Sequence, residues 1–334
     1  MPQPLSHRAK LCVLGAGAWG TALAIQAARA GATRVSLWAR DPARAAAMEA
    51  ARENARHLPG AALPPAIGVT ADMAAALAGA ALAVLAVPAQ HLRLALVALP
   101  PTVPPVVVVA KGVEAGSLKL PLEVVAEARP DLAAAVLSGP NFAHEVAAGL
   151  PAAAVAAGLD AGLRERAAAL LGSPAFRLYG SDDPVGVQVG GAAKNVIAIA
   201  AGAVIGAGLG ENARAALVTR GLAEISRLAV ALGGRPETVA GLSGLGDLLL
   251  TAAGPGSRNT SLGVELGRGR SLEAVLAGRV GVTEGVATAP ALVSRAAATG
   301  VELPICEAVA DLLGGRVTVA EAMARLLARP RRDE

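Results

Sequence analysis

An apolar run, a glycine-rich turn and a helix of small residues follow one another in residues 10–24, KLCVLGAGAWGTALA. Gly15, Gly17 and Gly20 have the spacing G-x-G-x-x-G. In a strand–turn–helix unit, the first glycine permits the tight turn, the second lets the backbone approach a pyrophosphate, and the third lets the helix pack on the strand. The helix N-terminus attracts the anionic phosphates. The segment predicts a dinucleotide-binding turn; the alternative, in a chain with 39 glycines, is a coincidental glycine turn.

A second apolar run, RVSLWA at residues 34–39, ends at Arg40. This arrangement normally places an acidic residue near here, on the adenosine ribose, whereas an arginine accommodates a 2′-phosphate. We therefore expect the chain to bind NADP(H). Asp41 comes next in the chain and keeps NAD(H) possible, and a surface arginine without a ligand is the alternative.

Composition excludes several classes of protein. With 334 residues, 54% of them hydrophobic, the chain can bury a large core, and its length favours two domains. Aromatic residues are only 1% and the net charge is +4, and no basic segment is interleaved with aromatic residues. We therefore do not expect nucleic-acid binding. The longest apolar run, residues 196–209, is shorter than the roughly 20 residues of a membrane-spanning helix, and we expect a buried core helix there and no membrane insertion.

Cysteine and histidine usage gives no metal site. The two cysteines, Cys12 and Cys306, are far apart, and the four histidines are scattered. We expect reduced thiols and a cytoplasmic protein, since residues 1–8 also lack the apolar stretch of a signal peptide.

Strands and helices alternate in the first half of the chain. Strand-like runs occur at residues 11–14, 35–38, 81–87, 106–110 and 134–137, and a further apolar run and a helix fall within residues 151–179. This alternation predicts a parallel sheet covered on both faces. From the sequence SDDP at residues 181–184 onward, the pattern changes to long helices. We expect an α/β N-terminal doubly wound domain of the Rossmann type at residues 1–180 and an all-α C-terminal domain at residues 181–334, with a substrate cleft between them.

Two of the four lysines stand in unusual settings. Lys111 follows the strand-like run VVVVA, at the sheet edge where open α/β folds bind ligands, and Lys194 lies in a helix too apolar to be exposed. A dehydrogenase must move a proton on or off the substrate oxygen, which lysine can do if its pKa falls from about 10.4 to about 7–8. Desolvation and a neighbouring cation such as Lys111 would lower it. We expect Asn195 to orient the oxygen; a lysine reaching the surface from a helix end is the alternative.

Residues 241–259 read GLSGLGDLLLTAAGPGSRN and predict an anion site. Arg258 offers a planar fork suited to phosphate, and Ser257 and Asn259 add neutral donors beside glycine turns with free amides. Asp247 is expected to pair with Lys194. A helix cap at Asp247 and a solvated loop at Arg258 are the alternatives.

Another candidate segment is LSGPNFAHEV at residues 137–146. We expect His144 there to be solvated or to cap a helix, and not to act as an acid.

Taken in order, the motifs GAGAWGTALA, LWARD, VPAQ, AKG, SGPNFAHEVAAGLP, GVQVGGAAKNVIAIAAG, NARAALVTRGLAE, GLSGLGDLLLT, SRN and VTEGVAT resemble the bacterial NAD(P)-dependent glycerol-3-phosphate dehydrogenases, over about residues 10–310. The resemblance implies reversible reduction of dihydroxyacetone phosphate to sn-glycerol 3-phosphate with NADPH or NADH. It also implies supply of glycerol 3-phosphate for phospholipid synthesis, and a homodimer.

The resemblance also implies site residues. Lys194 takes the place of the proton acceptor, and Lys111 contacts both substrate and cofactor. The other implied substrate positions are Gly139, Asn141, Asp247, Ser257, Arg258 and Asn259. Those implied for the cofactor, besides the glycines of the turn, are Ala18, Trp19, Arg40, Ala143, Arg258, Val282 and Glu284.

Two residues depart from the family pattern. Members usually have serine at the Ala18 position and serine or threonine at the Asn141 position, so Ala18 can offer only its backbone amide, and Asn141 must donate through a longer side chain. Two other functions also fit the pattern: a dehydrogenase of the same plan acting on a hydroxy acid or sugar nucleotide, and an NADP-binding sensor without activity.

Overall fold

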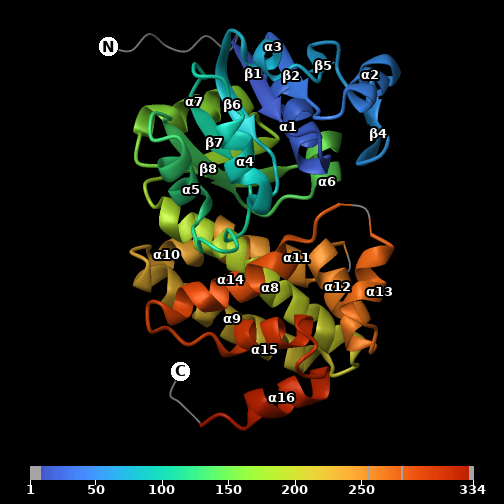
Figure 1. Cartoon of the computed structure of the whole chain (residues 1–334), viewed down its shortest axis with the longest axis vertical. Helices are drawn as coiled ribbons and strands as arrows, with labels where there is room; N and C mark the ends of the chain where they lie inside the picture. Colours follow the sequence, from blue (N-terminus) through green and yellow to red (C-terminus); the bar gives the residue numbers. More distant parts are fainter. Residues whose placement is uncertain (1–8, 255, 280, 331–334) are drawn as a thin grey trace. The chain divides into compact units, whose positions relative to one another are not determined.

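The computed structural model describes residues 9–254, 256–279 and 281–330, whose helices and strands are shown in Figure 1. The chain forms two compact units. The first contains the chain up to Ala110 and Pro121–Val187; the second contains Lys111–Leu120 and the chain from Gln188. The predicted domain boundary, between residues 180 and 181, lies shortly before the observed boundary between Val187 and Gln188. The sequence did not predict that Lys111–Leu120 belongs to the second unit.

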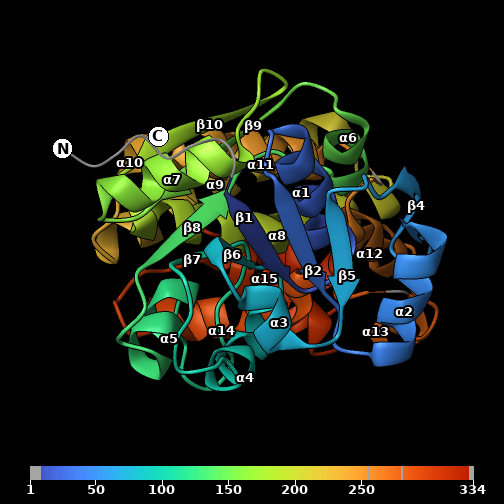
Figure 2. The same cartoon turned by 90° about the horizontal axis from the view of Figure 1, so that it is seen from above.

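The first unit is built on an eight-stranded sheet in the order β10-β9-β8-β7-β6-β1-β2-β5. The neighbouring strands β8, β7, β6, β1, β2 and β5 can be followed side by side in Figure 2. All neighbours pair in parallel except β8 and β9. The strands are β1 (Lys10–Leu14), β2 (Arg34–Trp38), β5 (Ile67–Thr70), β6 (Ala80–Leu85), β7 (Val106–Val108), β8 (Ala134–Ser138), β9 (Ala152–Ala157) and β10 (Phe176–Ser181), and a separate antiparallel pair is formed by β3 (Glu53–Asn54) and β4 (Leu58–Ala62).

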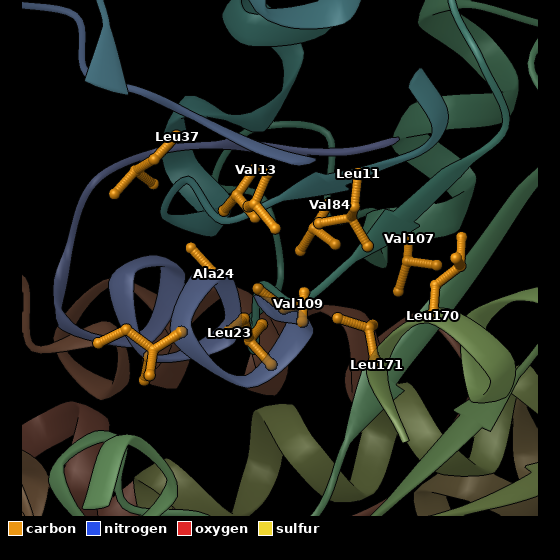
Figure 3. Packing of buried hydrophobic residues seen from close by; sticks show 14 of the residues in the cluster. Leu11, Val13, Leu23, Ala24, Leu37, Val84, Val107, Val109, Leu170 and Leu171 are labelled. Carbon is orange, nitrogen blue, oxygen red and sulfur yellow. The ribbon is translucent and has the colours of Figure 1, made fainter. Parts of the chain in front are cut away.

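Side chains alternate between the two faces of the sheet. In β1, Leu11 and Val13 join the core beneath α1, whereas Cys12 and Leu14 join a second core on the opposite face. Figure 3 shows the first of these cores, where strand residues face Leu23 of α1 and Leu171 of α7. Because both faces are apolar, each must be covered by helices. The predicted doubly wound fold is confirmed.

The helices of the first unit divide between these cores. Helices α1, α2, α6 and α7 contribute to the first, and α3, α4 and α5 contribute to the second. The bounds are α1 (Ala18–Arg29), α2 (Pro42–Ala51), α3 (Met73–Leu77), η1 (Ala89–His91), α4 (Leu92–Val97), α5 (Pro121–Ala128), α6 (Ala143–Ala148) and α7 (Ala161–Leu171).

The second unit contains helices and no strand within its described residues, which confirms the all-α prediction. Its long helix α8 starts at Pro184, in the first unit, where Asp183 Oδ1 accepts a hydrogen bond from the Gly186 amide at 2.8 Å. The helices are α8 (Pro184–Gly206), α9 (Glu211–Ala231), α10 (Pro236–Val239), η2 (Leu242–Gly246), α11 (Asp247–Ala252), α12 (Arg258–Gly267), α13 (Leu272–Ala277), α14 (Glu284–Ala297), α15 (Pro304–Leu313) and α16 (Val319–Leu327).

Helix α8 is long and apolar enough to cross a membrane, but 89% of its most apolar 18-residue window is buried inside the protein. It packs against α12 through glycines on both helices. A Cβ at Gly202 would lie 2.1 Å from the Thr260 carbonyl oxygen, and one at Gly263 would lie 2.0 Å from that of Ile199. Only glycine permits this approach. The contact brings the middle of α8 against the N-terminal turn of α12.

The C-terminal segment differs from what its sequence predicts. Residues 325–334, RLLARPRRDE, are rich in charge and predict a frayed tail, but α16 continues to Leu327. Thr318 and Glu321 form a capping box at its start, and Arg325 pairs with Asp311 at 3.3 Å. The capping box satisfies backbone donors that a frayed end would leave to water. Residues 331–334 lie outside the described residues.

A buried carboxylate caps α15. Glu224 of α9, 3% exposed, accepts hydrogen bonds from the Ile305 amide at 2.7 Å and the Cys306 amide at 3.2 Å. Burial raises its pKa from 4.5 to about 6, although both amide bonds lower it. The folded state therefore holds this proton more tightly than the unfolded chain does.

This shift predicts a pH-dependent stability. Because the pKa is higher in the folded state, the free energy of unfolding falls as pH rises from about 4.5 through 6, by about 2 kcal/mol for this group. Glu224→Gln should remove that contribution. Urea unfolding of both proteins between pH 4.5 and 7 measures the difference in slope, and parallel curves would contradict the assignment.

Candidate active site

The glycine turn has the geometry that the sequence predicts. Gly15 has φ +118°, and a Cβ there would lie 2.4 Å from the Ala86 carbonyl oxygen. A Cβ at Gly20 would lie 1.9 Å from the Gly15 carbonyl oxygen, so helix and strand approach too closely for any other residue. A Cβ at Gly17 meets nothing within 4 Å. The middle glycine therefore faces open space, as a phosphate-binding position requires.

Helix α1 begins at Ala18, followed by Trp19, and its N-cap residue Gly17 makes no side-chain capping hydrogen bond. The first amides of a helix have no partner within the helix and carry the positive end of its dipole. This terminus is chemically suited to a pyrophosphate, including at Ala18, whose backbone amide is the only donor that it offers.

Arg40 and Asp41 differ in their surroundings. Arg40 is exposed after β2 ends. Asp41 is the N-cap of α2, and its Oδ1 accepts hydrogen bonds from the Ala43 amide at 2.9 Å and the Arg44 amide at 3.2 Å. One carboxylate oxygen of the acid that we considered for NAD(H) is thus engaged in capping a helix.

The predicted residues of the SGPNF motif lie where β8 connects to α6. Gly139 has φ +153°, and a Cβ there would lie 2.8 Å from the Ala154 Cα. Asn141 donates from Nδ2 to the Ala153 carbonyl at 3.1 Å, while its Oδ1 is buried and accepts no hydrogen bond within the described residues. Ala143 starts α6. The side chain of His144 is 72% exposed, as we expected for a solvated histidine.

In the second unit, one carboxylate joins both candidate lysines. Asp247, 1% exposed, starts α11, and its Oδ2 lies 2.5 Å from Lys111 Nζ and its Oδ1 lies 3.0 Å from Lys194 Nζ. The predicted pairing of Asp247 with Lys194 is confirmed. Asp247 is not the cap of its helix, since the N-cap residue is Gly246.

A π-helical turn sets the position of Asp247. The turn η2 ends directly before this residue, and a Cβ at Gly244 within it would lie 2.0 Å from the Val239 carbonyl oxygen. Turns of this kind are frequent at functional sites.

The pKa of Lys194 is lowered by its surroundings. The residue is 7% exposed, and burial lowers its pKa from 10.5 to about 8. The charge of Asp247 opposes this shift, and the charge of Lys111 adds to it. The direction and the causes are those that the sequence suggested. Lys194 does not extend to the surface, and at neutral pH its ammonium group can still give up a proton.

Two threonines that the sequence analysis missed complete this cluster. Thr251 Oγ1 accepts a hydrogen bond from Lys194 Nζ at 2.7 Å and donates to Asp247 Oδ1 at 3.4 Å. Thr260 donates to the Thr251 carbonyl at 2.5 Å. Thr251 follows Asp247 by four residues on one helix, so their i, i+4 spacing on a shared face is the signal that could have indicated it.

Asn195 and Asn259 form a chain of buried amides. Asn195 donates from Nδ2 to the Lys111 carbonyl at 3.3 Å and accepts at Oδ1 from Asn259 Nδ2 at 2.8 Å. Asn259 Oδ1 accepts from the Gly285 amide at 3.1 Å. A Cβ at Gly285 would lie 2.7 Å from that oxygen. The chain fixes Lys111, α8, α12 and α14 relative to one another within the second unit.

The SRN motif starts α12. Ser257 is its N-cap and accepts from the Asn259 amide at 3.2 Å and the Thr260 amide at 3.5 Å, so these two amides already have a partner. The Arg258 side chain is exposed. Arg279 holds the backbone there, donating to the Arg258 carbonyl at 2.8 Å. An exposed guanidinium beside a second arginine suits an anionic ligand.

The last two predicted cofactor positions lie beside α14. Val282 is 41% exposed, and Glu284 is the first residue of the helix. Contacts within the second unit thus join five of the predicted residues: Lys111, Lys194, Asn195, Asp247 and Asn259. The predicted residues of the glycine turn, together with Arg40, Gly139, Asn141 and Ala143, belong to the first. Across the described ranges, no three histidine, cysteine or acidic side chains gather as metal ligands, and both cysteines are free and buried.

A doubly wound sheet with this glycine turn, and a helical unit with a buried lysine–carboxylate–lysine cluster, are features of a dinucleotide-dependent dehydrogenase. Comparison with known proteins narrows the class. The model of the N-terminal part of NAD-dependent glycerol-3-phosphate dehydrogenases matches residues 10–163, and that of their C-terminal part matches residues 183–324. The chain belongs to this family.

Individual proteins similar to this chain carry the name of the same family. The glycerol-3-phosphate dehydrogenase (NAD(P)+) of Caulobacter vibrioides is 56% identical over 274 residues, which cover 81% of this chain and 82% of that protein. The enzyme of the same name from Rhodospirillum rubrum is 53% identical over 282 residues, covering 84% and 80%. The crystal structure of the Coxiella burnetii glycerol-3-phosphate dehydrogenase has a TM-score of 0.92 and 35% identity, covering 97% of this chain and all of that one.

Proposed function

We propose that this chain interconverts dihydroxyacetone phosphate and sn-glycerol 3-phosphate, using NADPH or NADH in the direction of reduction. When bound, the reduced nicotinamide supplies a hydride to C2 of the ketone. Lys194 gives a proton from Nζ to the C2 oxygen, so the carbonyl π bond breaks while a C–H and an O–H bond form. The buried ammonium of Lys194, held by Asp247 at 3.0 Å and Thr251 at 2.7 Å, is the observation that carries the proposal.

The remaining residues of the lysine cluster position these groups. Lys111 adds a second positive charge beside the carbonyl oxygen, and Asp247 keeps both ammonium groups in place. Asn195 fixes the Lys111 backbone through its amide. Because Asn195 and Asn259 bond to each other, we assign them a positioning role in addition to any donation to substrate.

The cofactor residues fit a dinucleotide. The open space at Gly17 and the uncapped start of α1 suit its pyrophosphate, and the exposed Arg40 suits a 2′-phosphate. The other residues we assign to the cofactor are Gly15, Ala18, Trp19, Gly20, Lys111, Ala143, Arg258, Val282 and Glu284.

The phosphate of the substrate is assigned to the start of α12. Ser257, Arg258 and Asn259 supply a hydroxyl, a guanidinium and an amide there, and Gly139 and Asn141 are assigned to the same ligand from the first unit. A phosphate carries charge at every step of the reaction, so its contacts act on binding more than on the chemical step.

Removing the guanidinium tests this assignment. Arg258→Ala is expected to raise KM for dihydroxyacetone phosphate by about 10- to 100-fold with a smaller change in kcat, since a charged hydrogen bond contributes about 1.5–3 kcal/mol. Steady-state kinetics with the ketone varied at saturating NADPH give both constants. Arg270→Ala, at an exposed arginine paired with Glu265 in the same unit, is the matched control. An unchanged KM would move the phosphate site elsewhere.

The activity itself is tested by following oxidation of NADPH and NADH at 340 nm with dihydroxyacetone phosphate. We expect turnover with both cofactors. Turnover only with a 2-oxo acid, or oxidation of a sugar nucleotide, would assign the chain to another dehydrogenase of the same plan. Dinucleotide binding without turnover on any of these would make it a sensor.

We further infer a cytoplasmic homodimer that supplies glycerol 3-phosphate for phospholipid synthesis, with the first unit binding the dinucleotide and the second carrying the proton-transfer residues. Family resemblance and the reduced cysteines support this context. Nucleic-acid binding and membrane insertion are not part of the proposal.

A further inference from the structure

The carbonyl group of Ala16, inside the glycine turn, is held by two side chains from distant segments. Asn54 of β3 donates from Nδ2 to the Ala16 oxygen at 3.0 Å, and Arg44 of α2 donates to the same oxygen. A carbonyl oxygen has two lone pairs and can accept both hydrogen bonds. Ala16 lies between Gly15 and Gly17, so this oxygen belongs to the peptide group that leads directly into the middle glycine.

Asn54 also reaches the helix that follows the turn. The same Nδ2 donates to Thr21 Oγ1 of α1 at 2.7 Å. Asn54 is 1% exposed, and its Oδ1 is buried with no hydrogen-bond partner within the described chain. The carbonyl of Ala16 can only accept, so the atom facing it must be the amide nitrogen. The Asn54 side chain is thus oriented so that its Nδ2 donates both hydrogen bonds, while its Oδ1 accepts none within the described chain.

Peptide geometry turns this contact into a constraint on the phosphate site. A trans peptide is planar, and its carbonyl oxygen and amide hydrogen point in opposite directions. Fixing the Ala16 oxygen against Asn54 and Arg44 therefore fixes the Gly17 N–H on the opposite side. There is open space beside Gly17, since an added Cβ at this residue would meet no atom within 4 Å.

We propose that Asn54 is a positioning residue for cofactor binding: it holds the peptide of Ala16 and Gly17 so that the Gly17 amide is oriented in advance toward the pyrophosphate of the dinucleotide. The inference rests on the proposed function, because it presupposes that the glycine turn binds NAD(P)H. Donors that are already oriented lose less freedom on binding, which increases affinity. Because Asn54 is 1% exposed, it is proposed to act through the turn and not through contact with the ligand.

The chain offers a matched control on the same helix. Gln26 of α1 is also 1% exposed, and its Nε2 donates to the Leu171 carbonyl at 2.9 Å and to Ser173 Oγ at 2.9 Å. Asn54 and Gln26 therefore each use a buried amide nitrogen to join a carbonyl oxygen and a hydroxyl. Only the bonds of Asn54 involve the glycine turn.

The experiment compares Asn54→Ala with Gln26→Ala by isothermal titration with NADPH and with adenosine 2′-monophosphate, which lacks the pyrophosphate. We expect Asn54→Ala to raise the Kd for NADPH by about tenfold, the effect of about 1.4 kcal/mol, and to leave the Kd for adenosine 2′-monophosphate within about twofold. Gln26→Ala should change neither Kd, although urea unfolding should show both variants destabilised alike.

Every outcome decides the proposal. An unchanged NADPH affinity in Asn54→Ala, or equal weakening of both ligands, would overturn it, as would equal weakening of NADPH in Gln26→Ala. If Asn54→Ala does not fold, Asn54→Asp keeps the volume but replaces the donor by a carboxylate, and the same loss confined to NADPH is expected. Failure of the parent protein to bind NADPH would instead contradict the proposed function.

Discussion

Replacing Lys194 with alanine is expected to lower kcat for dihydroxyacetone phosphate reduction by about 10²- to 10⁴-fold, the usual contribution of a positioned general acid. Lys194 is 7% exposed and contacts Asp247 and Thr251, so no solvent-borne acid takes its place without rearrangement of the site. The Kd for NADPH should stay within about threefold, because the glycine turn lies in the other compact unit.

Kinetics of Lys194→Ala, with NADPH binding measured by titration, give both quantities. Lys119→Ala is the matched control, since it removes a lysine that is not assigned to the site, and it should retain parental kcat. Near-normal kcat in Lys194→Ala would show that Lys194 is not the proton carrier.

The pH profile of the parent protein tests the same assignment, because it should change with opposite sign in the two directions of the reaction. The pKa of Lys194 is lowered to about 8, and reduction requires its protonated form. In that direction kcat/KM should be constant below pH 8 and fall above it. Oxidation of glycerol 3-phosphate requires the neutral amine, so kcat/KM in that direction should rise through the same pH.

Local patterns predicted much of this architecture, because they express geometry within a few residues. The apolar pairs of β1 alternate between two cores, and an apolar run of this kind indicates a strand buried on both faces. The glycines of the turn could be assigned individual roles because each role follows from a backbone contact next to it. The unusual settings of two of the four lysines identified Lys111 and Lys194.

Other elements were missed because their own residues are weak indicators. The edge strands β5 (IGVT) and β10 (FRLYGS) are short and contain glycine, and only pairing with β2 and β9 defines them. Helix α14 starts at Glu284, four residues before Thr288, where the sequence pattern alone predicts its start. The Gly285 amide in its first turn is bonded to Asn259 of another helix. No local pattern contains that contact.

The site shows the same division between local and distant information. The sequence indicated which side chains carry charge and which can donate a proton, but not how they are held. Asp41 acts as a helix cap, and Asn195 and Asn259 bond to each other across 64 positions of the chain. Such contacts give individually predictable residues a fixed position.

Asp247→Asn is expected to be the second most damaging substitution, and its effect should depend on pH. Asparagine keeps the shape but leaves two ammonium groups without the carboxylate that now lies 2.5 Å from Lys111 Nζ and 3.0 Å from Lys194 Nζ. Asp247 raises the pKa of Lys194, whereas burial and Lys111 lower it. Removing the carboxylate should therefore lower that pKa further, by roughly one to three pH units for a charge this close.

The expected result for reduction follows from that shift. At pH 7.5 the ammonium of Lys194 becomes scarce, so kcat/KM should fall by about 3- to 250-fold for a shift of that size, and the pH at which the profile declines should move below 8. Part of the lost activity should return as the pH is lowered toward 6. Asp247→Glu keeps the charge, so it should lose rate through altered geometry without moving the midpoint. A loss in Asp247→Asn that is uniform from pH 6 to 9 would show that the carboxylate supports the fold but does not control proton transfer.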